Sequence, residues 1–177
     1  MRSAANGEKM TQKTMKSLFA ALMTASGLVV SACVVVDADE VVTDTRPSVS
    51  YYSPDIVAEG AKLPFSKAVK AGHTIYLSGE LGVDYSTTTL VPGGVGPETT
   101  QIFANIEDTL DEYGADLSDL VKCTVFLDDM AEFGAMNAAY TAALPDPKPA
   151  RSTLGADGLA LGAALEIECI AVIGRSR

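Results

Sequence analysis

Hydrophobic and polar positions alternate along two short stretches of the chain, residues 74–78 and 121–127. The first stretch reads Thr-Ile-Tyr-Leu-Ser and ends at Gly79. One face of the second stretch carries Val121, Cys123, Val125 and Leu127. Side chains two positions apart project from the same face of a strand. The alternation therefore predicts strands that each bury one face.

Between these strands, apolar residues recur at intervals of three and four, which predicts an amphipathic helix packed on a sheet. Pro97 suits its first turn, and Gly114 marks its end. The expected buried stripe consists of Phe103, Ile106, Leu110 and Tyr113.

A second helix is expected to begin at Asp129, whose side chain can cap it while Glu132 closes a capping box. Pro145 stops this helix. Its expected buried stripe consists of Phe133, Met136, Tyr140 and Leu144. The order of a strand group, helix, strand, helix and strand predicts an α+β sandwich with both helices on one face of a mixed sheet.

The N-terminal region has the features of a bacterial lipoprotein signal peptide. Lys13 and Lys16 precede an apolar stretch of small residues that ends in Val-Ser-Ala-Cys at residues 30–33. A basic region, a short apolar run and small residues before a cleavage point are typical of secretory signals. We expect residues 1–32 to be removed and Cys33 to be lipidated, with Met15 as an alternative start. Val34 after the cysteine favours the periplasmic face of the outer membrane.

The segment 33–47 is acidic and rich in small residues, and it is interpreted as a tether, with one domain at 48–177. Removing residues 1–32 takes four basic residues and one acidic residue from totals of 13 and 23, which leaves a net charge of −13. A surface this acidic repels phosphate groups, so the charge argues against nucleic acid and against direct contact with anionic lipids. The lipid anchor would be the sole membrane attachment.

The remaining cysteines, Cys123 and Cys169, occupy apolar positions of strand-like runs. We favour buried, unreactive thiols over a disulfide, because a sequence does not establish disulfide geometry. His73 follows a turn glycine and is interpreted as an exposed turn residue. With one histidine and no Cys-x-x-Cys motif, we expect no metal site.

Candidate ligand chemistry lies near the C-terminus. Arg151 follows two prolines, and a guanidinium on a loop can bind a small carboxylate through two hydrogen bonds. Glu166 begins a Glu-Ile-Glu run that offers a carboxylate. Taken alone, Arg151 would be a surface ion pair, and Glu166 would be a solvent-facing strand residue.

Several motifs in the right order resemble the Rid (reactive intermediate deaminase, YjgF-like) family over residues 65–172. They are Gly-His-Thr-Ile-Tyr-Leu-Ser-Gly at 72–79, Val-Lys-Cys-Thr-Val-Phe-Leu at 121–127, the 129–140 helix, Pro-Ala-Arg-Ser at 149–152 and Glu-Ile-Glu at 166–168. The resemblance implies a chorismate-mutase-like α+β fold, a homotrimer with clefts between neighbours and no cofactor. It also implies hydrolysis of enamine and imine intermediates to 2-keto acids and ammonia.

Carried over position by position, the resemblance makes Arg151 the clamp on the substrate carboxylate and Glu166 the group that activates water. It places Gly79, Thr153 and Asn137 around the cleft. A further substrate-binding position, usually tyrosine in active members, holds Phe65 here, and Glu80 replaces a common glutamine. Two hypotheses follow: an imine deaminase, or a non-catalytic trimer that binds small carboxylates at the membrane surface.

Overall fold

The computed structural model describes residues 47–54, 57–58, 61–62 and 64–174. The expected signal peptide, Cys33 and nearly all of the tether lie outside these residues. No helix within the described ranges is long and apolar enough to cross a membrane.

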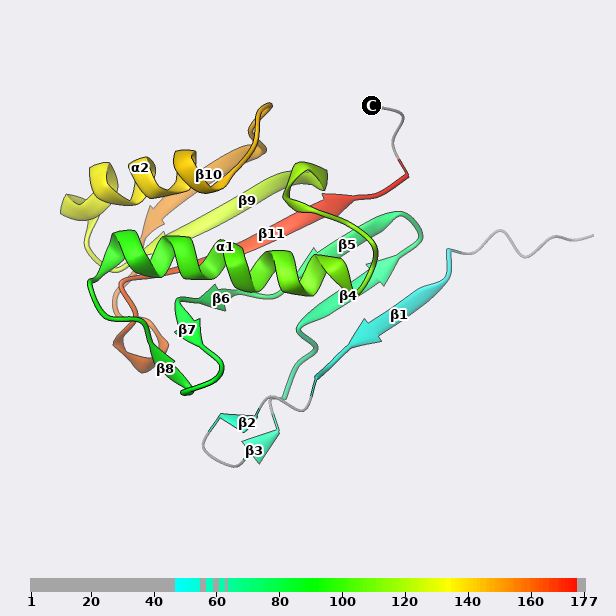
Figure 1. The fold of residues 1–177 in the computed structure, drawn as a ribbon, viewed down its shortest axis with the longest axis horizontal. Helices are drawn as coiled ribbons and strands as arrows, with labels where there is room; N and C mark the ends of the chain where they lie inside the picture. Colours follow the sequence, from blue (N-terminus) through cyan, green and yellow to red (C-terminus); the bar gives the residue numbers. More distant parts are fainter. Residues whose placement is uncertain (1–46, 55–56, 59–60, 63, 175–177) are drawn as a thin grey trace, which may run out of the picture. The chain divides into compact units, whose positions relative to one another are not determined.

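The domain is one mixed sheet covered on one face by two helices, as the sequence predicts (Figure 1). Seven strands make up this sheet, six of them in the order β1-β4-β5-β11-β9-β10, and β6 pairs with β11. The strands are β1 (Val49–Tyr52), β4 (Ala68–Ala71), β5 (Thr74–Leu77), β6 (Glu80–Leu81), β9 (Leu120–Leu127), β10 (Ala150–Gly155) and β11 (Leu165–Val172). Only β10 runs parallel to its neighbour, β9, while the other pairs are antiparallel.

Two small hairpins stand apart from this sheet. They are formed by β2 (Val57–Ala58) with β3 (Ala61–Lys62), and by β7 (Val83–Asp84) with β8 (Thr89–Leu90). Short 3-10 turns at Leu117–Asp119, Met130–Glu132 and Ala160–Gly162 connect the larger elements.

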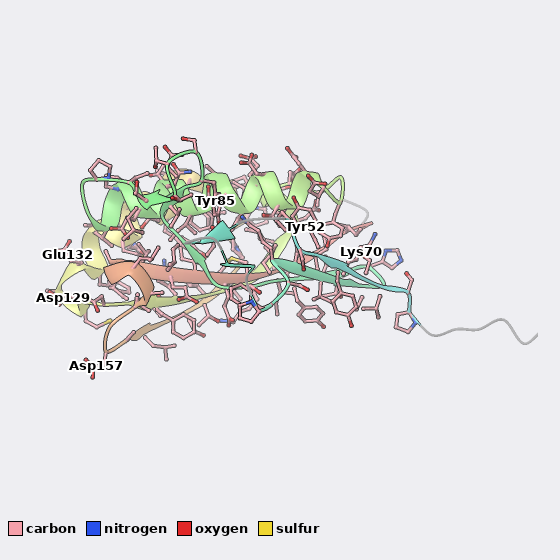
Figure 2. All side chains as sticks on the ribbon, turned by 90° about the horizontal axis from the view of Figure 1, so that it is seen from below. Tyr52, Lys70, Tyr85, Asp129, Glu132 and Asp157 are labelled. Atoms are coloured by element: carbon pink, nitrogen blue, oxygen red, sulfur yellow. A yellow bond between two sulfur atoms is a disulfide. The ribbon has the colours of Figure 1, made fainter. Side chains whose placement is uncertain are left out.

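The helices α1 (Val95–Asp111) and α2 (Phe133–Ala143) form a layer on one side of the sheet, and none of the described residues forms a helix on the other side (Figures 1 and 2). The core between the layers is formed by the apolar faces of both helices and of β5, β9 and β11. Its fully buried large side chains include Ile75, Ile102, Phe103, Ile106, Leu110, Leu127, Met136, Leu165 and Ile167. The face opposite the helices is called the open face below.

The start of the second helix differs from the prediction. The carboxylate of Asp129 accepts a hydrogen bond from the Ala131 amide, but it caps a 3-10 turn, and α2 begins at Phe133. Phe133 itself is 38% exposed rather than buried. A ring in the first turn of α2 lies at the end of the helix, where less of the core covers it.

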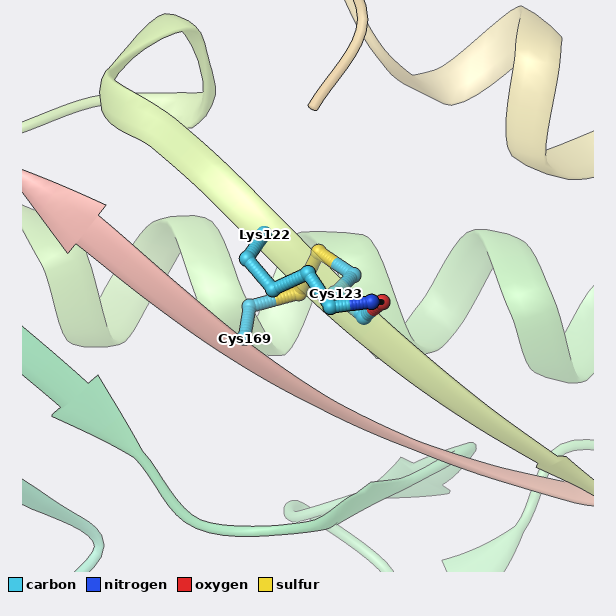
Figure 3. Close-up of a disulfide and its surroundings, with 3 residues drawn as sticks. All are labelled: Lys122, Cys123 and Cys169. Atoms are coloured by element: carbon cyan, nitrogen blue, oxygen red, sulfur yellow. Dashed lines mark hydrogen bonds between the residues drawn. A yellow bond between two sulfur atoms is a disulfide. The ribbon is translucent and has the colours of Figure 1, made fainter. Parts of the chain in front are cut away.

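The prediction of two free thiols is wrong. Cys123 on β9 and Cys169 on β11 are directly opposed in the strand register, with Cα atoms 4.1 Å apart, and they form a disulfide (Figure 3). Both side chains face the helices and are almost completely buried. The apolar pattern placed them correctly in the core, but only the pairing of β9 with β11, distant in sequence, brings the two sulfurs together.

Candidate active site

Arg151 lies on β10, the edge strand, with its side chain directed at α2. Its Nη2 donates a hydrogen bond to Oδ1 of Asn137 at 2.9 Å. Its Cζ is 4.6 Å from the ring centroid of Tyr140 and 5.6 Å from that of Phe133. These three helix residues are spaced by four and three positions, so one side of α2 presents them all to the guanidinium.

Arg151 keeps donors available for a ligand. In the described part of the chain, ion pairs join Lys67 to Glu80 and Lys148 to Asp146, and no carboxylate pairs with Arg151. A guanidinium has five N–H donors, and Asn137 takes one of them. The surface ion pair considered for Arg151 is therefore not formed with any described residue, and the guanidinium can accept an anionic group.

Glu166 lies on β11 and is half-buried. Burial raises the pKa of its carboxyl, and the negative charges of Glu168 and Glu80 raise this pKa further. Raising the pKa of a carboxyl makes its carboxylate a stronger base, which favours a role in general acid–base chemistry.

Gly79 makes room for this carboxylate. A Cβ atom added at residue 79 would lie 1.8 Å from Oε1 of Glu166 and 2.6 Å from its Cδ. A contact that short excludes any side chain at residue 79 unless Glu166 moves. The predicted pair of Gly79 and Glu166 is thus brought together, and the glycine is explained by close approach.

Glu80 has a role that sequence reasoning missed. It is 6% exposed, and its carboxylate contacts the Lys67 ammonium at 3.2 Å. It also accepts hydrogen bonds from the Tyr85 hydroxyl at 2.5 Å and from the Asn105 amide at 3.2 Å. A buried carboxylate with these partners is satisfied, so a charged residue replaces the family's glutamine without an unpaired buried group. The only sequence signal was the departure from the family pattern.

The structure places Arg151 and Glu166 on opposite faces of the sheet. Arg151 is opposed to Cys123, which is opposed to Cys169, so all three project to the helix side. Glu166 precedes Cys169 by three residues on the same strand, and side chains an odd number of positions apart project to opposite faces. One copy of the chain therefore does not enclose a small ligand between these two groups.

The other predicted residues are distributed over both regions. Asn137 is in contact with Arg151, and Thr153 projects to the helix side two positions after it, with a buried hydroxyl that has no hydrogen-bond partner among the described residues. Phe65 is 52% exposed.

Two hollows of the described surface contain neither Arg151 nor Glu166. One, of about 220 Å³, lies between β1, α1 and Tyr85. The other, of about 240 Å³, lies on the open face and is lined by β5, β9 and β11. No cluster of three or more His, Cys, Asp or Glu side chains that could hold a metal ion occurs in the described ranges.

Comparison with known proteins identifies the family. Residues 56–173 match the family model described as Endoribonuclease L-PSP. "Protein mmf1, mitochondrial" of Schizosaccharomyces pombe is 41% identical over 123 residues, which cover 68% of this chain and 73% of that protein. The chain belongs to the YjgF (Rid) family. The resemblance found in the sequence motifs is therefore confirmed.

Further relatives of this Rid protein carry enzyme names. The 2-iminobutanoate/2-iminopropanoate deaminase of Mus musculus is 42% identical over 111 residues, covering 63% of this chain and 82% of that protein. The crystal structure of RidA from the Antarctic bacterium Psychrobacter sp. PAMC 21119 matches with a TM-score of 0.64 and 35% identity. The match covers 70% of this chain and 99% of that one.

Proposed function

We propose that this Rid protein is a hydrolase that converts enamine and imine intermediates to 2-keto acids and ammonia. The observation that carries the proposal is a guanidinium held by Asn137 and aromatic rings, with no carboxylate partner among the described residues. Several curated relatives are named 2-iminobutanoate/2-iminopropanoate deaminase. Arg151 binds the substrate carboxylate, and Glu166 transfers protons between water and the imine nitrogen.

The reaction needs little beyond positioning and proton transfer. The oxygen of a water molecule bonds to the imine carbon while Glu166 accepts one water proton, and the C=N bond becomes a C–N single bond. Glu166 returns this proton to nitrogen, which leaves an –OH and an –NH2 group on the same carbon. The hydroxyl proton then moves to nitrogen, the C–N bond breaks, and NH3 leaves as the C=O bond forms. Water and imine thus give one 2-keto acid and one ammonia, with no redox step. Holding the carboxylate and water in place supplies much of the rate.

We also propose that the complete site forms between copies of a homotrimer. Arg151 and Glu166 occupy opposite faces in one copy, so a cleft between neighbours can combine the arginine of one with the glutamate of another. Binding of nucleic acid is disfavoured by the net charge of −10 for the whole chain, although the family description names an endoribonuclease.

Phe65 supports the alternative function, a non-catalytic trimer that binds small carboxylates. The phenolic hydroxyl common in active members is missing here, and losing one hydrogen bond to a charged ligand costs roughly 1.5–3 kcal/mol. The same Arg151 would bind the carboxylate in both cases. Phe65→Tyr should raise the hydrolysis rate if the site is catalytic.

One assay separates the two functions. Purified protein is mixed with an amino-acid oxidase and an amino acid, and imine decay is followed with and without it. We expect faster decay, lost in Arg151→Ala and barely rescued in Arg151→Lys, because an ammonium does not reproduce the two-pronged hydrogen bonding. Binding of 2-keto acids by calorimetry with no acceleration of decay, even in Phe65→Tyr, would establish the binding module.

Export and lipid anchoring are proposed from the N-terminal sequence. The disulfide between Cys123 and Cys169 supports them, because disulfides persist in oxidising compartments such as the periplasm. Cys33→Ser should release the protein from membranes, and mass spectrometry of the wild type should find acyl chains on an N-terminal Cys33. An unmodified Cys33 in membrane-extracted protein would contradict the proposal.

A further inference from the structure

We propose that Tyr140 is a positioning residue for Arg151, and that its ring sets the affinity for the carboxylate of the substrate. This inference rests on the proposed function, because it assigns a partner to the arginine that binds the carboxylate. It concerns a tyrosine that the hydrophobic pattern explains entirely as a core residue of α2.

One hydrogen bond and two aromatic rings hold the guanidinium of Arg151. Asn137 accepts one N–H at 2.9 Å, which fixes one corner of the planar group. The Tyr140 ring centroid lies 4.6 Å from Cζ and that of Phe133 lies 5.6 Å from it. Both distances are within the range at which a cation is attracted to an aromatic face. Tyr140 is the closer ring.

Tyr140 is also the more rigid ring. It is 3% exposed and packs edge to face against Phe103, with ring centroids 5.2 Å apart and an interplanar angle of 81°. Phe103 is itself 1% exposed. Phe133 is 38% exposed and has more freedom to turn. The core therefore fixes the orientation of Tyr140, and Tyr140 restrains a long side chain that lies on an edge strand.

An aromatic partner suits a ligand-binding arginine better than a carboxylate does. A carboxylate would occupy the N–H donors of the guanidinium and neutralise its charge, whereas a ring face attracts the cation and leaves the N–H groups free. No carboxylate pairs with Arg151 in the part of the chain that the structure describes. Pre-orienting the fork of donors in this way lowers the entropy cost of binding.

The hydroxyl of Tyr140 does not hold Arg151 in place. It is buried and has no hydrogen-bond partner among the described residues. Burial raises the pKa of Tyr140, and the positive charge of Arg151 offsets part of this effect, so the phenol stays neutral at physiological pH. The inference therefore assigns the effect to the ring, and Tyr140→Phe should behave like the wild type.

The test measures 2-oxobutyrate binding by calorimetry and imine hydrolysis by the coupled oxidase assay. Tyr140→Leu should raise both Kd and KM about tenfold while kcat stays within about twofold. The reason is that the ring stabilises the bound substrate and the transition state equally. Tyr140→Phe should restore both values. Replacing Tyr140 by progressively fluorinated phenylalanines keeps the ring shape and withdraws charge from its face. Kd should rise steadily along that series, which also covers the case in which Tyr140→Leu fails to fold.

Tyr113 supplies the matched control. Its hydroxyl is also buried without a partner among the described residues, and its ring packs edge to face on Tyr52 instead of on the arginine. Tyr113→Leu should leave Kd unchanged. The inference is overturned if Kd is flat across the fluorinated series, if Tyr140→Phe loses as much affinity as Tyr140→Leu, or if Tyr113→Leu loses as much.

Arg151→Ala separates this inference from the proposed function. If Arg151→Ala binds 2-oxobutyrate like the wild type, the carboxylate clamp itself is wrong and the inference about Tyr140 falls with it. If Arg151→Ala loses binding while the fluorinated series stays flat, the clamp stands and only the role of Tyr140 is wrong.

Discussion

At the scale of single residues, Glu166 combines a functional demand with a cost in stability. Its pKa is raised in the folded protein, so the folded state holds the proton of this carboxyl more tightly than the unfolded chain does. The protonated carboxyl of Glu166 therefore contributes fully to stability below the ordinary pKa of a glutamate. This contribution is lost as pH rises through the raised pKa of the folded protein. Above the raised pKa, the ionised carboxylate therefore opposes folding.

This sign predicts opposite effects of Glu166→Gln on activity and stability. Binding of 2-oxobutyrate should stay nearly intact, while imine hydrolysis falls by roughly two to four orders of magnitude, the usual contribution of general acid–base catalysis. The urea midpoint at pH 7 should rise, because a neutral amide does not repel Glu168 and Glu80. Full activity in Glu166→Gln would exclude the proton-transfer role.

A second residue-scale prediction concerns the pH profile of the wild type. Glu168 is exposed and is one of the two charges that raise the pKa of Glu166. Removing that charge in Glu168→Gln should lower the pKa of Glu166, so the acidic limb of the kcat profile should move to lower pH. A pH–rate series measures the shift, and an unchanged or higher limb would show that another group controls it.

The third residue-scale prediction uses the close approach of Gly79. Gly79→Ala places a Cβ atom 1.8 Å from Oε1 of Glu166, so the carboxylate must move and hydrolysis should fall at least tenfold. The matched control is Gly96→Ala in α1, where nothing lies within 4 Å of an added Cβ and a modest gain in helix stability is expected. Equal activity in the two variants would mean that the position of the carboxylate is unimportant.

At the scale of elements, periodicity predicted what depends on local sequence. The helices around Phe103 and Met136 and the strands around Ile75 and Val125 appear as expected, because each buries an apolar face whose spacing is visible in the chain. Phe133 was misplaced because periodicity does not show where a helix extends past the core.

Hydrophobic periodicity does not predict contacts between strands that are distant in the sequence. The opposition of Cys123 to Cys169 depends on which strand lies beside β9 and in which register. The burial of Glu80 depends on Lys67, Tyr85 and Asn105 from three other segments. For the site, the family motif named Arg151 and Glu166, but only the register shows that they project to opposite faces.

The disulfide gives the element-scale prediction. It closes a loop with a sequence separation of 46, for which the chain-entropy model gives a stabilisation of about 4 kcal/mol. Replacing both cysteines by alanine should lower the free energy of unfolding by about 2–4 kcal/mol, measured by urea denaturation. Wild-type protein treated with reductant under unfolding conditions should match the double variant. Identical urea midpoints for the variant and the oxidised wild type would mean that the bond adds nothing.

At the scale of the whole molecule, the open face of the sheet carries exposed apolar side chains that a partner could bury. An apolar row crosses it through directly opposed residues of β1, β4, β5 and β11, namely Tyr51, Val69, Tyr76 and Ile170. Tyr51 is 71% exposed and Tyr76 is 50% exposed in one copy. Large rings in a continuous exposed apolar row mark an interaction surface. We propose that other copies of the chain cover this row in the homotrimer.

The molecular-scale prediction links assembly to activity. Light scattering of the protein without residues 1–33 should give a trimer at micromolar concentration. Tyr76→Glu puts a charge into the apolar row, where burial is costly, and should yield monomers. Because one copy holds Arg151 and Glu166 on opposite faces, those monomers should also lose imine hydrolysis. Ala104→Glu adds the same charge on the exposed side of α1 and should stay trimeric and active. A monomeric wild type, or a fully active Tyr76→Glu monomer, would refute a site shared between copies.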